Sequence, residues 1–108
     1  MITMRIKPKF LSLIRKGIKK HEYRLNKDKY KDINIGDQIK LVSNDDENDF
    51  IVIKVKNIKV YKDFESAIDM NDFIPLYNDK ETLVKECNTF YLKEDIERLG
   101  IKVFEIEY

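Results

Sequence analysis

The stretch GIKKHEYRL, residues 17–25, places one carboxylate among several cations. Lys19, Lys20 and Arg24 surround Glu22 within a few positions of the chain. Nearby positive charge favours the ionised form of a carboxylate, and an ionised carboxylate can accept hydrogen bonds from the N–H groups of a nucleic-acid base. Lysine binds phosphate as a point charge, whereas arginine offers planar donors for a phosphate or a base edge. These residue types predict a site for a nucleotide-like ligand.

The same stretch alternates as a β-strand does, so even and odd positions take opposite faces. The even face carries Lys20, Glu22 and Arg24, and the odd face carries His21, Tyr23 and Leu25. We expect the odd face to point into the core and the even face to line an outer surface or cleft, with Lys19 at the start of the strand within reach of a phosphate. The competing interpretation is a solvated ladder of surface charges with no ligand.

The charged residues are unevenly distributed along the chain. Residues 1–31 contain eleven Lys and Arg against two acids, 11 − 2 = +9, and the other 77 residues contain ten against eighteen, 10 − 18 = −8. Such asymmetry indicates a basic surface for an anionic partner. It is equally compatible with pairing between the two segments across the fold, which contributes little energy when the pairs are exposed.

Composition limits the remaining possibilities. A chain of 108 residues fits one domain, residues 1–108. Its single cysteine, Cys87, and single histidine, His21, offer neither an internal disulfide nor a Cys/His metal cluster, so we expect no metal and no cofactor. We expect a buried, unreactive Cys87 and a His21 at the edge of the core. No apolar run approaches the ~20 residues of a membrane span, which predicts a cytoplasmic protein with no membrane partner.

Periodicity predicts a small α+β barrel of about five strands with short flanking helices. The expected strands are 2–6, 19–25, 34–44, 49–61 and 101–108, and the expected helices are 7–17, 63–70, 79–87 and 93–100. A change of apolar face within the fourth strand indicates a bulge near Lys56–Asn57.

The order of several short motifs resembles the ASCH domain, a branch of the PUA-like superfamily. The resemblance rests on Gly17, Lys19, Glu22 and Arg24 after the first helix, followed by the turn Gly36–Asp37. The segments IKVKNIKVYKDFESAI and FYLKEDIERLGIKVFEIEY also resemble the family's long strand with its helix and its closing helix–Gly–strand unit.

The resemblance implies a PUA-like barrel that binds RNA or a nucleotide-like ligand. It also adds Tyr91, because the equivalent part of the family often borders the cleft, and an unstacked nucleotide needs an aromatic face beside its cations. The expected ligand-binding residues are therefore Lys19, Lys20, Glu22, Arg24 and Tyr91.

Two other functions remain open from the sequence. A hydrolase acting on acylated nucleosides or single-stranded RNA would use Lys19 or Glu22 as general base and Arg24 to stabilise developing charge. The similar acetylcytidine amidohydrolases carry a threonine where this chain has Glu22, so their mechanism does not transfer. A protein-interaction domain would instead use an apolar patch in the segment DFIPLYND, formed by Phe73, Ile74, Leu76 and Tyr77.

Overall fold

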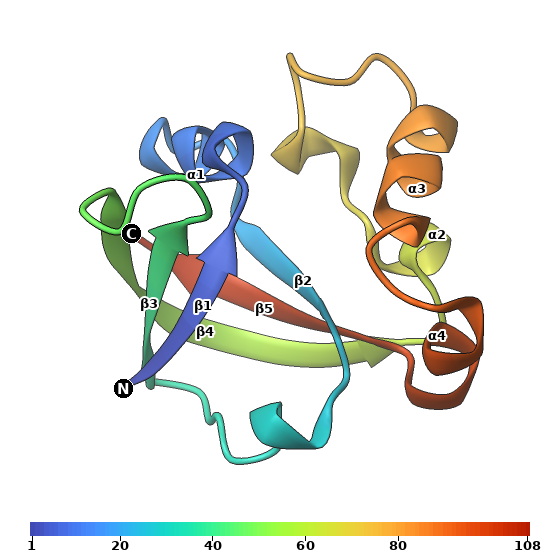
Figure 1. Ribbon diagram of the computed structural model, residues 1–108, viewed down its shortest axis with the longest axis horizontal. Coiled ribbons are helices and arrows are strands. Elements are labelled where there is room, and N and C mark those ends of the chain that lie inside the picture. The colour runs from blue at the N-terminus through green and yellow to red at the C-terminus, as the bar shows by residue number, and fades with distance from the viewer.

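The computed structural model describes all residues from 1 to 108 and contains one curled five-stranded sheet (Figure 1). The strands follow the order β1-β3-β4-β5-β2, with β1 parallel to β3 and every other pair antiparallel. Their bounds are β1 Ile2–Ile6, β2 His21–Leu25, β3 Gln38–Ser43, β4 Phe50–Tyr61 and β5 Ile101–Glu107. The curl brings the two edge strands towards each other, and Arg24 Nη2 of β2 donates to the backbone oxygen of Arg5 in β1 at 2.7 Å.

The helices flank the sheet in two groups: α1 lies between β1 and β2 in the chain, and α2, α3 and α4 lie between β4 and β5. Their bounds are α1 Pro8–Arg15, α2 Phe64–Ala67, α3 Lys80–Asn88 and α4 Lys93–Leu99, with short 3₁₀ turns at Asp28–Tyr30 (η1) and Met70–Asp72 (η2). The helical segment, residues 64–99, connects β4 to β5 and stands beside the barrel (Figure 1). The predicted α+β barrel of about five strands with flanking helices is therefore confirmed.

Local sequence explains where these elements begin. Pro8 occupies the first turn of α1. A backbone N–H in that turn has no acceptor within the helix, so a proline there loses no hydrogen bond. The carboxylates of Asp63 and Asp79 accept the backbone N–H of Ser66 and Thr82 and so cap α2 and α3.

The interior of the barrel is apolar and follows the expected strand alternation. Ile51, Ile53 and Val55 of β4 are buried, whereas the residues between them are exposed. The pairing of β4 with β5 shifts register between Val55 and Asn57, which confirms the predicted bulge. The bulge lets one strand contribute to two differently oriented parts of the curled sheet.

The expected orientation of β2 was wrong. In its antiparallel register with β5, Glu22 lies opposite Phe104, and opposite residues share a face of the sheet. Phe104 is fully buried, so the even positions of β2 point into the barrel. The odd positions face the helical segment, where Tyr23 contacts Phe73 with ring centroids 5.6 Å apart. Both faces of this edge strand are covered, which strand periodicity alone does not reveal.

None of the helices combines the length and the apolar character that crossing a membrane requires.

The junction between α4 and β5 depends on a glycine. Gly100 has φ 76° and ψ −175°, a region that only glycine readily adopts, and a Cβ there would lie 2.6 Å from the backbone oxygen of Tyr61. We expect Gly100→Ala to lower the free energy of unfolding by about 3 kcal/mol in urea denaturation.

Gly17→Ala is the matched control, because Gly17 has a φ of 75° but no atom within 4 Å of the added Cβ. We expect it to cost only about 1 kcal/mol. Equal losses for the two variants would show that the close approach to Tyr61 is unimportant.

Candidate functional site

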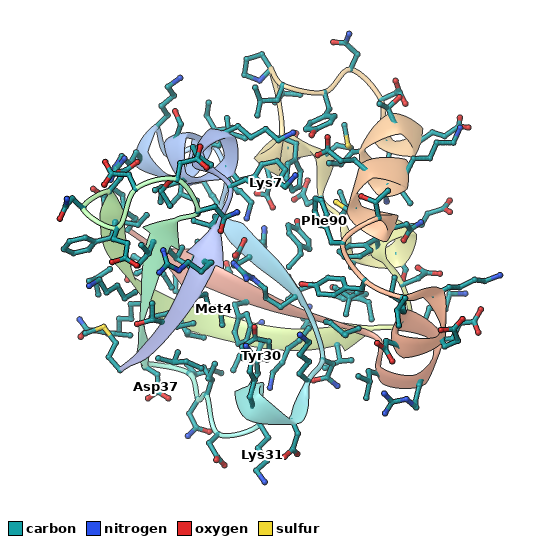
Figure 2. The ribbon with its side chains drawn as sticks, viewed as in Figure 1. Met4, Lys7, Tyr30, Lys31, Asp37 and Phe90 are labelled. Carbon is teal, nitrogen blue, oxygen red and sulfur yellow. The ribbon has the colours of Figure 1, made fainter.

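A pocket of about 200 Å³ lies where β1, α1 and β2 of the barrel meet the helical segment. Its cationic lining residues are Arg5, Lys7, Lys19 and Arg24, and its aromatic ones are Phe10, Tyr23, Phe64, Phe73, Phe90 and Tyr91. Lys7 extends from the barrel side to Phe90 on the helical segment, with Nζ 4.7 Å from the ring centroid (Figure 2). The lining therefore combines positive charge with flat apolar surfaces.

Glu22 stands at the centre of this lining and is held by two cations. Lys19 Nζ donates to Oε1 at 2.8 Å, and Arg24 donates to Oε2 from Nε at 2.9 Å and also from Nη2. The side chains of Lys19 and Glu22 are only 2% and 6% exposed, and that of Arg24 is 15% exposed. We call these three residues the buried triad; it carries a net charge of +1.

The opposite charges of Glu22 and Arg24 each stabilise the ionised form of the other residue. Burial alone would raise the pKa of Glu22, but the charges of Arg24 and Lys19 and their hydrogen bonds outweigh burial and lower it to about 2. Burial would likewise lower the pKa of Arg24, but Glu22 raises it. Glu22 is therefore an anion at neutral pH.

The end of α1 places Lys19 against Glu22. Gly17 adopts a positive φ after the helix, and the backbone N–H groups of Ile18 and Lys19 then both donate to the oxygen of Leu13. The chain turns directly into β2, and Lys19 Nζ also donates to the backbone oxygen of His21.

Asp72 fixes the opposite side of β2. It is 2% exposed and accepts hydrogen bonds from the backbone N–H of Lys20, from His21 Nδ1 and from the Tyr23 hydroxyl. These bonds hold η2, and with it the neighbouring pocket residue Phe73, against the strand. Sequence reasoning missed Asp72, since nothing local links it to a strand about fifty residues earlier.

The structure brings together four of the five expected ligand-binding residues. Lys19, Glu22, Arg24 and Tyr91 all line the pocket, and the Tyr91 ring stacks on Phe64 with centroids 6.2 Å apart and planes 12° apart. Lys20 does not line the pocket. Its side chain is exposed and borders a separate surface depression.

The predicted apolar patch in DFIPLYND is only partly present. Phe73 is buried and forms a pocket wall, and the Tyr77 hydroxyl bonds to Lys9 and Glu86. Ile74 and Leu76 remain, 50% and 45% exposed. The expected cluster of four exposed apolar residues was therefore wrong.

Cys87 also lines the pocket and is buried, as expected. Burial and the nearby Glu86 raise the pKa of its thiol to about 12. Because the thiolate is the reactive form of cysteine, this thiol is not an activated nucleophile.

Comparison with known proteins places this pocket in a family context. The model of the ASCH domain matches residues 4–107. The chain belongs to the ASCH-domain family. ASCH domains are PUA-like domains that are generally thought to bind RNA.

Two solved structures of ASCH type resemble the whole chain. The crystal structure of hypothetical protein PH0355 has 30% sequence identity and a TM-score of 0.82 over 97% of this chain and 95% of that one. The solution structure of protein PF0455 from Pyrococcus furiosus has 26% identity and a TM-score of 0.71 over 98% and 94%. No curated protein matches the chain.

The lowered pKa of Glu22 predicts acid sensitivity. A carboxyl whose pKa falls from its ordinary value of 4.5 to about 2 on folding stabilises the fold above pH 4.5, and this stability is lost as the pH falls through 2. The shift corresponds to about 3 kcal/mol. We expect the wild type to lose about that much more free energy of unfolding than Glu22→Gln between pH 5 and pH 2, measured by urea denaturation.

Glu47→Gln provides the control. It removes a carboxyl whose pKa is also lowered, by Arg5, but which is fully exposed. This variant should keep the acid sensitivity of the wild type. If Glu22→Gln and the wild type lose stability in parallel, Glu22 does not form the ion pairs described.

Proposed function

We propose that this ASCH domain binds single-stranded RNA by holding one unstacked base in the pocket and the adjacent phosphates at its mouth. The observation that carries the proposal is the buried triad inside an aromatic-lined pocket. Recognition of single-stranded RNA relies on unstacked bases that lie against aromatic or guanidinium planes and form hydrogen bonds along their edges. The pocket offers both kinds of contact.

The size of the pocket supports a single base as the occupant. Pockets for drug-sized ligands span roughly 300–1,000 Å³, and this one measures about 200 Å³. It suits one flat ring and leaves the sugar and phosphates outside.

Two lysines that lie over aromatic rings of the pocket lining support phosphate binding beside the pocket, and one of them, Lys7, itself lines it. Lys7 lies over Phe90 and Lys27 lies over Tyr91, with Nζ 4.7 and 5.8 Å from the respective ring centroids. Neither lysine forms an ion pair with a carboxylate. Three other basic residues of the N-terminal segment do pair with acids elsewhere in the chain, namely Arg5 with Glu47, Lys9 with Glu86 and Arg15 with Asp49. Ion pairs with acidic residues thus neutralise part of the positive charge of residues 1–31, but they leave Lys7 and Lys27 unpaired.

Three features favour binding over hydrolysis. A general base works best with a pKa near the working pH, and a carboxylate with a pKa of about 2 is a weak base. The pocket thiol of Cys87 is protonated at neutral pH. His21 is held by Asp72 and does not line the pocket.

Lys7→Ala tests the position of the phosphates. Each neutralised phosphate of a single strand contributes about −0.7 to the slope of log K against log salt. We expect Lys7→Ala to weaken binding of a mixed-sequence RNA decamer and to reduce the slope by roughly that amount, measured by fluorescence polarisation from 20 to 200 mM salt.

Lys93→Ala is the control, since Lys93 is exposed on α4 and lines no part of the pocket. It should leave the slope unchanged. An equal change in both variants would mean that phosphates contact the surface indiscriminately, and no association of the wild type with RNA at low salt would refute the proposed function.

Phe90→Ala tests the aromatic surface at the mouth. Phe90 is 37% exposed, and a base stacked on an aromatic ring contributes about 1–3 kcal/mol. We expect RNA affinity to fall about tenfold or more. Leu92→Ala removes a neighbouring, more exposed apolar side chain, 65% exposed, and should change affinity little. A comparable loss in both would exclude stacking on Phe90.

A further inference from the structure

We infer that Arg5 is a further phosphate contact of the RNA site, and that Glu47 of the β3–β4 hairpin competes with RNA for it. This inference rests on the proposed function and describes how the protein limits its own binding of RNA. The hairpin, residues 44–49, contains four acidic residues in six positions, and one of them reaches back to a residue of the pocket.

Arg5 lies beside the buried triad, but its side chain points away from the interior of the barrel. Its backbone oxygen accepts a hydrogen bond from Nη2 of Arg24, whose Nη1 has no partner in the protein. Met4 and Ile6 are buried in the core, so strand alternation turns the Arg5 side chain outwards, where it is 52% exposed. Because Arg5 also lines the pocket, its guanidinium is placed for a phosphate outside the pocket rather than for the base within it.

Arg5 and Lys7 form a short row of cations along the chain. The backbone remains extended at Lys7, with φ −65° and ψ 138°, and alternate residues of an extended chain share a side. Two extended residues span about 6.6 Å, and both cations line the pocket. An arginine can bind one phosphate through two parallel N–H groups. The row therefore offers a second phosphate contact next to Lys7.

The hairpin holds Glu47 against the guanidinium of Arg5. The backbone N–H of Asn44 donates to the oxygen of Ile6 at 2.9 Å, which ties the start of the hairpin to the end of β1. Glu47 Oε1 accepts from Arg5 Nη2 at 2.7 Å. The hydrogen bond and the charge of Arg5 lower the pKa of Glu47, so its carboxylate is ionised at neutral pH. A phosphate that approaches Arg5 must therefore displace another anion.

This ion pair can open when RNA binds. The side chain of Glu47 is 81% exposed, and ion pairs between exposed residues contribute little to stability. A phosphate offers Arg5 the same charge-assisted hydrogen bonds as the carboxylate does. The displaced carboxylate would still repel the phosphates nearby. Glu47 thus lowers the affinity for RNA moderately without blocking the site.

A second ion pair of the same hairpin provides a matched control. Asp49 pairs with Arg15, and Arg15 borders a separate surface depression and does not line the pocket. Asp49→Asn and Glu47→Gln each remove one negative charge from the hairpin. Only Glu47→Gln releases a cation that lines the pocket.

The test measures the affinity of these variants for the mixed-sequence RNA decamer by fluorescence polarisation at 20 mM salt. We expect Glu47→Gln to bind about threefold more tightly than the wild type, because Arg5 no longer has to leave a carboxylate. Asp49→Asn should gain about 1.5-fold or less, from reduced general repulsion alone.

A double-mutant cycle then isolates the contribution of Arg5. We expect Arg5→Ala to weaken RNA binding. In that background Glu47→Gln should increase affinity no more than Asp49→Asn does in the wild type, since no guanidinium is left to release.

Three results would overturn the inference while RNA binding stands. These are an unchanged affinity in Glu47→Gln, equal gains in Glu47→Gln and Asp49→Asn, and an undiminished gain from Glu47→Gln in the Arg5→Ala background. The second and third would mean that the hairpin only repels RNA in general. If neither the wild type nor any variant associates with the decamer, the proposed function itself is refuted.

Discussion

The ion pairs of Glu22 are the interaction on which the rest of the site depends. A buried carboxylate without partners costs several kcal/mol, and removal of one member of such a group leaves the others as uncompensated buried charges. Lys19 brings the end of α1 to Glu22, and Arg24 links Glu22 to the backbone of β1 across the gap between the edge strands. One carboxylate thus fixes both cations and closes the seam of the barrel.

A single edge strand connects this interaction to the helical segment. The even side chains of β2 form the triad, and His21 and Tyr23 on the odd side bond to Asp72 of η2. The strand therefore belongs to both walls of the pocket. Because its two faces are held by charged or hydrogen-bonded groups with specific geometry, the pocket is preorganised, which lowers the entropic cost of ligand binding.

The sequence predicted the elements well and the site in part. Strand alternation, the bulge near Asn57 and the glycines at helix ends are local signals, and all correspond to observed features. The spacing of Lys19, Glu22 and Arg24 identified the centre of the pocket. The sequence prediction put the wrong face of β2 towards the core. Alternation shows which residues share a face of a strand, but it does not show what covers each of the two faces. Asp72 and the wall residue Phe73 escaped prediction because their positions depend on how a distant segment packs.

The central claim is that the spare N–H groups of Arg24 receive the ligand. NMR spectroscopy of the ¹⁵N-labelled protein can follow the guanidinium signals of Arg24 while the mixed-sequence RNA decamer is added. Glu22 and Arg5 hold Nε and Nη2, so we expect slow exchange of these protons before RNA is added and a large shift of the Nη1 signals on binding. The account would be contradicted if RNA shifted the signals of His21 and Lys59, which line a different surface depression, and left the signals of Arg24 unchanged.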